Sequence, residues 1–229
     1  MANKVETSQD VTVAEAVSKT EKFFEENGKK FLAVLVAVII IIAGTYMYKH
    51  MIVDKNADKA LSAIVDAQDR ISGENPEYEK ALNGDENGAG FLSVIEKYGS
   101  TPAGNIAKHY AGACYLHLGD FENAKKYLAM YSPVKGIMGS IINAQNLGLR
   151  ADVEVELNNL KEAAKLYGEA AKKSVNDFTT PLYLYKQGLV LTALGEKAEA
   201  KACYEKILSE YATAVEAREA DKLISQLSE

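Results

Sequence analysis

An uncharged stretch near the N-terminus constrains this chain more than any other feature. It runs from Phe31 to Tyr48, reads FLAVLVAVIIIIAGTYMY, and is bounded by Lys29 and Lys30 on one side and by Lys49 on the other. As a helix its eighteen residues would rise about 27 Å, close to the roughly 30 Å hydrocarbon core of a bilayer. A lone segment in lipid satisfies its backbone only as a helix, so we expect a single transmembrane helix here.

Two other interpretations of the stretch are weaker. A buried helix of a soluble domain usually keeps a polar stripe, and this one has none. A cleaved signal peptide has a short basic leader and a small-residue cleavage site, whereas about thirty residues precede this run and it ends in Tyr-Met-Tyr. Tyr46 and Tyr48 stand where interfacial aromatic residues are expected, so these tyrosines, with Lys29, Lys30 and Lys49, mark the predicted membrane boundary.

The flanking lysines indicate the orientation of this segment. Within roughly twenty residues of the run, four lysines precede it and three follow it, which is a bias of one charge toward a cytoplasmic N-terminus. We therefore expect residues 1–30 to form a cytoplasmic, partly helical leader. The helix within this leader should stop near Gly28. The alternative topology places the part after the anchor in the cytosol.

Composition excludes several classes of protein. The net charge is −6 and no Lys/Arg-rich run occurs, so we do not expect nucleic acid as a partner. The two cysteines, Cys114 and Cys203, are far apart in sequence, which excludes a disulfide-rich scaffold and a CxxC metal or redox site.

Three later segments share a pattern. They are LGDFENAKKYLAMY at 118–131, LNNLKEAAKLYGEAA at 157–171 and LGEKAEAKACYEKIL at 194–208. In each, an alanine follows the first leucine by six residues, and an aromatic residue follows that alanine by three or four. The aligned alanines, Ala124, Ala163 and Ala200, are 39 and 37 residues apart. A period in this range indicates stacked helical units.

Glycines before these segments suggest pairs of closely packed helices. AKHYAGACYLHLGD and LYLYKQGLVLTALGE both place a glycine, Gly112 or Gly188, seven residues before the turn glycine. A glycine in the first helix would let the second helix approach, and Asp120 is suited to cap the second helix of its pair. In the middle segment, Ala151 is aligned with the close-packing glycine and Asn159 with the turn glycine.

This pattern resembles the tetratricopeptide repeat, in which two antiparallel helices carry a small residue, a turn glycine, an alanine and an aromatic residue. The resemblance implies an all-α fold, with one N-terminal transmembrane helix followed by a tetratricopeptide-repeat-like helical array. The chain then divides into a leader at 1–30, an anchor at 31–48, linker helices and a loop at 49–100, and about three irregular repeats at 101–229.

The whole layout resembles the YfgM-like family of bacterial single-pass proteins, which are ancillary subunits of the Sec translocon. The FFEENGKK approach to the span and KYGSTPAGNIAKHYAGACYLHLGDFENAKKYL at 97–128 carry this resemblance. It implies an inner-membrane protein whose periplasmic repeat domain binds translocon subunits, membrane-bound chaperones and exported polypeptides. No cofactor and no small-molecule substrate are expected.

If the first helices of the repeats line a groove, as in the repeat family, nine residues are candidates for binding a partner. They are Ile106, His109, Ala113, His117, Asp152, Glu156, Tyr185, Lys186 and Leu189. This mixed lining suits a peptide or a helix better than a small molecule. The alternative is that these residues pack against a neighbouring helix and bind nothing.

Catalytic and metal-binding patterns are weak. His109 and His117 lie eight residues apart on one predicted helix, two turns from each other, which is too far to chelate one metal. No GxSxG, HExxH, P-loop or GxGxxG sequence occurs, and NGDENGAG at 83–90 reads as a flexible loop. We therefore expect no enzyme. The alternatives are a scaffold for another envelope or division complex, and an enzyme with a composite site at the two histidines.

Overall fold

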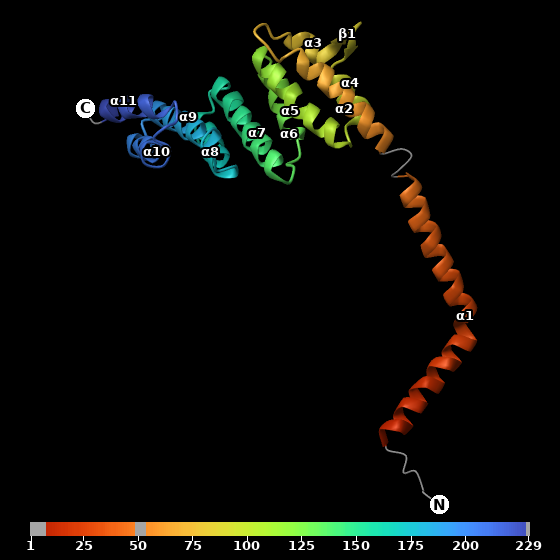
Figure 1. Cartoon of the computed structure of the whole chain (residues 1–229). Helices are drawn as coiled ribbons and strands as arrows, with labels where there is room; N and C mark the ends of the chain where they lie inside the picture. Colours follow the sequence, from red (N-terminus) through yellow and green to blue (C-terminus); the bar gives the residue numbers. More distant parts are fainter. Residues whose placement is uncertain (1–7, 49–53, 228–229) are drawn as a thin grey trace, which may run out of the picture. The chain divides into compact units, whose positions relative to one another are not determined.

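The computed structural model describes the backbone of residues 8–48 and 54–227, and these residues form eleven helices and one short hairpin. The chain divides into two compact units, Met1–Lys55 and Asn56–Glu229. Figure 1 labels the elements of both units. Each unit is described by itself.

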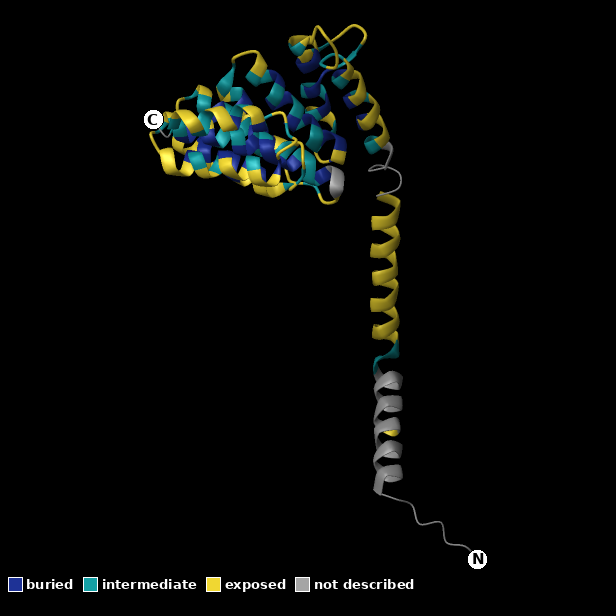
Figure 2. Ribbon diagram, turned by 60° about the vertical axis from the view of Figure 1, so that its left-hand side comes forward, coloured by how far each residue is buried: buried dark blue, intermediate teal, exposed yellow. Residues whose placement is uncertain are grey.

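The first unit is one long helix, α1, from Ser8 to Tyr48. Its segment Asn27–Tyr48 is long and apolar enough to cross a membrane, and every residue from Phe31 onward is exposed (Figure 2). The predicted stop at Gly28 is wrong, because the helix continues through that residue. A glycine inside a helix costs only about 1 kcal/mol relative to alanine, and it ends a helix only where the chain takes a left-handed turn.

The second unit stacks three helical hairpins and a last helix. The hairpins are α5 (Pro102–His117) with α6 (Phe121–Met130), α7 (Ile137–Glu156) with α8 (Leu160–Lys173), and α9 (Thr179–Ala193) with α10 (Lys197–Glu210). The last helix is α11 (Ala217–Leu227). This arrangement confirms the predicted all-α fold with a repeat-like helical array.

The same tight turn joins the two helices of every hairpin. Its central residue has a positive φ, which is +78° at Gly119, 60° at Asn158 and +77° at Gly195. In all three turns this residue's N–H donates to a carbonyl three residues earlier, and the next N–H donates to a carbonyl five residues earlier. Asparagine adopts this left-handed conformation more readily than other non-glycine residues.

The middle turn corrects the predicted alignment. Asn158 occupies the left-handed position, whereas Asn159 takes the place of Asp120 at the start of the next helix. Asp120 caps α6 as predicted, since its Oδ1 accepts a hydrogen bond of 3.1 Å from the Asn123 N–H. The second repeat is therefore closer to the pattern of the other two than its sequence indicates.

Close packing at the predicted glycines is confirmed. A Cβ placed on Gly112 would lie 2.5 Å from Cγ of Leu128, and one on Gly188 would lie 2.4 Å from Cε1 of Tyr204. Leu128 and Tyr204 belong to the second helices, and both are fully buried. In the first and third hairpins the first helix therefore holds a large side chain of its partner in the space that a missing Cβ leaves.

The residues before the first repeat belong to the same compact unit. Helices α2 (Asp54–Asp69), α3 (Tyr78–Asn83) and α4 (Phe91–Tyr98) share one hydrophobic cluster with α5. Strands β1 (Gly84–Asp85) and β2 (Gly88–Ala89) form a hairpin where a flexible loop was expected. Arg70 holds this hairpin, since its guanidinium donates to Asp85 at 2.7 Å and to the Ala89 carbonyl at 3.2 Å.

The core follows the repeat period. Ala124, Ala163 and Ala200 are all fully buried, as their spacing indicated. Buried residues lie between the helices along the array, and exposed ones lie on its outside (Figure 2). The largest cluster spans the helices from α7 to α11.

The close contact at Gly188 generates a prediction. A Gly188→Ala variant of the detergent-solubilised chain should lose about 1–3 kcal/mol of unfolding free energy, because the new methyl group meets the Tyr204 ring. In an uncrowded helix a change from glycine to alanine stabilises the fold by about 1 kcal/mol. The sign of the measured change in unfolding free energy therefore shows whether the site is crowded. Urea denaturation measures it. The loss should shrink in a Tyr204→Leu background, and equal losses in both backgrounds would contradict this explanation.

Candidate functional site

A groove crosses the first helices of the three repeats in two adjoining sections. The apolar section has a volume of about 590 Å³ and lies between α2, α5 and α7. The polar section has a volume of about 450 Å³ and extends from α3 across α5 and α7 to α9. Tyr110 and Gln145 line both sections, so they form one continuous surface, which we name the inner groove.

Aliphatic side chains from three helices form the apolar section. Leu61 and Ile64 come from α2, Ile106 from α5, and Ile141 and Ile142 from α7. Leu61 is 59% exposed although it is a large hydrophobic residue. An exposed apolar surface in a concave site is typical of a binding site for another chain.

An ion pair crosses the polar section. Lys186 of α9 donates to Oδ1 of Asp152 on α7 at 2.7 Å, and the Tyr167 hydroxyl of α8 donates to the same oxygen. The buried Tyr183 ring lies beside this group, and burial together with the Asp152 charge raises its pKa to about 12. The section therefore offers fixed hydrogen-bonding groups whose opposite charges are already paired.

The structure brings six of the nine predicted groove residues to the inner groove. His109, Ala113, His117, Asp152 and Lys186 line the polar section, and Ile106 lines the apolar section. Glu156, Tyr185 and Leu189 line neither section. Tyr185 instead packs against Tyr204, with ring centroids 6.2 Å apart, and Leu189 is 40% exposed outside the groove.

His109 departs from the expectation of an exposed groove residue. Only 4% of it is exposed, because its ring packs against Tyr110 and Tyr131. The Asn146 amide nitrogen donates to the Leu128 carbonyl at 3.3 Å and lies 3.4 Å from His109 Nδ1. The neutral ring accepts there and carries its proton on Nε2. Burial lowers the pKa of His109 to about 4.

His117 lies in a different environment from His109. It is exposed, and its ring stacks on Tyr78 of α3 with a centroid distance of 4.4 Å and an interplanar angle of 9°. Within the described residues no group of three or more His, Cys, Asp or Glu side chains could hold a metal ion. His109 is packed in the wall of the groove, and His117 stacks on Tyr78 at its edge.

Sequence reasoning missed much of the α7 lining. Ile142, Gln145 and Leu149 face the groove from the first helix of the second repeat. Their spacing of three and four residues is the helical period that could have found them. This repeat matches the tetratricopeptide pattern weakly, so its groove-lining positions were not aligned with those of the other two repeats.

The predicted membrane boundary residues fall on α1. Lys29, Lys30, Tyr46 and Tyr48 are all exposed and lie toward the two ends of the apolar segment. Lys49 lies outside the described residues.

The burial of His109 predicts a pH-dependent stability. Its ordinary pKa is 6.5 and its folded pKa is about 4, so between these values the unfolded chain binds more protons than the folded chain. Stability should be complete above pH 6.5 and should fall by up to about 3 kcal/mol as the pH drops to 4. Denaturant midpoints across this range measure it.

A matched pair of variants isolates the His109 contribution. The loss of stability below pH 6.5 should shrink in the His109→Leu variant, because it removes the buried ring. It should persist in the His117→Gln variant, because the histidine replaced there is exposed. An unchanged pH profile in His109→Leu would assign the acid sensitivity to other groups.

Comparison with known protein families matches the chain to the tetratricopeptide repeat-like domain over residues 21–225. The match includes the apolar helix as well as the three hairpins. Comparisons with curated proteins and with solved structures give no match. Both the helical hairpins and the extent of the match lead to one conclusion: the chain belongs to the tetratricopeptide repeat-like domain family.

Proposed function

We propose that this protein is a membrane-anchored scaffold that binds segments of other proteins in its inner groove and catalyses no reaction. The single observation that carries this proposal is the composition of the groove. An apolar section and a hydrogen-bonding section adjoin at Tyr110 and Gln145, on the first helices of a repeat array.

The groove fits a short peptide segment better than a small metabolite. The Asp152–Lys186 pair is satisfied internally, so a ligand gains little from a full charge at that point. The exposed Leu61 and the partly exposed Ile106 and Ile142 of the apolar section would instead bury one face of an amphipathic segment. Such a segment would place its apolar residues near Ile106 and Ile142 and its polar groups toward Asp152.

The anchor in this proposal is the apolar segment of α1. The family match begins at residue 21, before this segment, which supports its retention in the working protein. The one-lysine bias favours a cytoplasmic N-terminus, and the repeat unit would then lie in the periplasm of a bacterial inner membrane. Confinement to the membrane plane would raise the concentration of the groove near membrane-bound partners.

The partners in this proposal come from the YfgM-like resemblance. They are subunits of the Sec translocon, membrane-bound chaperones and polypeptides that emerge from export. A scaffold for another envelope or division complex would use the same groove and anchor, so partner identity separates the two. An enzyme centred on His109 and His117 is disfavoured, because His109 is 4% exposed and His117 stacks on Tyr78.

The anchor predicts a defined topology. A reporter that is active only in the periplasm should work when fused after Leu227, and a reporter that is active only in the cytosol should not. The chain should also stay in the membrane pellet at alkaline pH, because its apolar segment is buried in lipid. The reverse reporter pattern would place the groove in the cytosol and rule out periplasmic partners.

The groove predicts a site-specific contact. A photo-crosslinking residue at Ala113 should trap translocon subunits or exported chains in living cells, and Ile142→Arg should reduce these adducts several-fold by placing a charge in the apolar section. Ala202→Arg, on the exposed side of α10, is the matched control and should leave the adducts unchanged. Adducts made only of division proteins would contradict the proposed link to export.

A further inference from the structure

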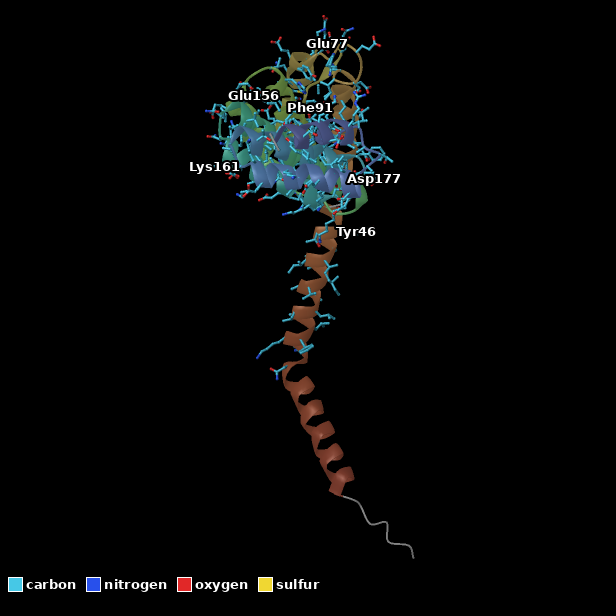
Figure 3. All side chains as sticks on the ribbon, turned by 90° about the vertical axis from the view of Figure 1, so that its left-hand side faces the viewer. Tyr46, Glu77, Phe91, Glu156, Lys161 and Asp177 are labelled. Carbon is cyan, nitrogen blue, oxygen red and sulfur yellow. The ribbon has the colours of Figure 1, made fainter. Side chains whose placement is uncertain are left out.

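The hairpins give the repeat unit two different edges. Because the helices alternate in direction, the tight turns at 118–120, 157–159 and 194–196 share one edge, which we name the turn edge. The longer connections at 131–136, 174–178 and 211–216 share the opposite edge, which we name the loop edge. Figure 3 shows Glu156 and Lys161 on one side of the array and Asp177 on the other.

Hydrogen bonds hold the loops of the loop edge in place. The Asn105 side chain of α5 pairs with both backbone groups of Ser132, at 2.7 and 2.8 Å. Asn143 of α7 pairs in the same way with Val134, at 2.8 and 3.0 Å. These contacts join the 131–136 loop to the helices on both sides of it.

The 174–178 loop is ordered in a similar way. The Asn176 side chain accepts from the N–H groups of Phe178 and Thr179, at 2.9 and 2.8 Å, and donates to the Ser174 carbonyl at 2.7 Å. This network leaves Val175 74% exposed and Phe178 85% exposed. An ordered loop that displays large apolar side chains has already lost much of the entropy that binding would otherwise cost.

Other exposed apolar residues lie on the same edge. Val215, in the 211–216 loop, is 87% exposed, and Met130, at the end of α6, is 43% exposed. On the turn edge only Leu118, which is 42% exposed, is a comparably exposed large hydrophobic residue among the described ones.

Charge also distinguishes the two edges. Residues 117–122, 156–162 and 193–199 of the turn edge carry six carboxylates and two lysines. Residues 130–136, 172–178 and 210–216 of the loop edge carry three lysines and three carboxylates, and the lysines, Lys135, Lys172 and Lys173, all lie at the first two loops. In the part of the chain that the structure describes, no ion pair joins these lysines to a carboxylate.

The chain enters the repeat unit at the loop edge. Leu61, in the first half of α2, lines the apolar section together with Pro102 and Ala103, the first residues of α5. The beginning of α2 therefore lies on the side where α5 begins, which is the loop edge. Only five residues of sequence separate Tyr48, the last residue of α1, from the start of α2.

We propose that the loop edge is a membrane-contacting surface that binds anionic phospholipid. Phe178, Val175 and Val215 would enter the boundary between headgroups and acyl chains, while Lys172 and Lys173 face lipid phosphates. The inference rests on the membrane anchor of the proposed function. A bilayer is favoured over a protein partner because the chain reaches the unit at this edge, and because the apolar side chains project from separate loops instead of lining a cavity.

Tryptophan fluorescence tests the contact directly, because the chain contains no tryptophan. The full chain would be reconstituted into vesicles of phosphatidylethanolamine and phosphatidylglycerol, with brominated acyl chains in part of the lipid as the quencher. Phe178→Trp should be quenched nearly as strongly as Tyr46→Trp, which lies within the apolar helix. Leu118→Trp, on the turn edge, is the matched control and should keep its emission. Adding Lys172→Glu and Lys173→Glu should weaken the quenching of Phe178→Trp.

Each other outcome overturns the inference in a distinguishable way. Quenching of Tyr46→Trp without quenching of Phe178→Trp refutes the loop-edge contact and leaves the anchor intact. Equal quenching at Phe178 and Leu118 would indicate non-specific adsorption of the repeat unit. A blue shift of Phe178→Trp without quenching would assign the edge to contact with a second copy of the chain and would refute the lipid contact. No quenching of Tyr46→Trp would refute the anchor and, with it, this inference.

Discussion

The repeat unit depends on how closely the two helices of a hairpin approach each other. At Gly112 and Gly188 the first helix has no side chain, and Leu128 or Tyr204 of the second helix takes that space. A residue in the left-handed conformation then reverses the chain within three residues. The left-handed turn keeps all three pairs antiparallel, and in the first and third pairs the glycine contact also brings the two helices close together.

Alternating helix direction has a chemical consequence. The tight turns bring the acidic first turns of α6, α8 and α10 to one edge, and the longer connections bring exposed apolar side chains and lysines to the other. The inner groove lies between the first helices and is a third surface. The apolar section of the groove reaches the loop edge at Pro102, Val134 and Lys135, so the peptide-binding groove and the lipid-binding edge that we propose adjoin at these residues.

Much of the fold was predictable because it depends on local patterns. The anchor candidate follows from eighteen uncharged residues, and the buried alanines follow from their spacing of 39 and 37 residues. The second repeat was harder to predict, because Asn158 adopts the left-handed conformation that a glycine adopts in the other two turns, and only its backbone angle shows this. Linker helices were predicted at 49–100, but the hairpin of β1 and β2 was read as a loop, since its strands have two residues each.

The sequence by itself determined the helical class, the N-terminal apolar segment and the repeat period. These features depend on the spacing of residues and on the length of the segments, which are properties of the sequence before the chain folds. Only the tertiary structure decided that His109 is buried, that Lys186 pairs with Asp152 across the groove, and that Phe178 is exposed on an ordered loop. The first two depend on which helices become neighbours, since residues more than thirty positions apart meet only when the hairpins stack. The third depends on the hydrogen bonds of Asn176, which order the loop.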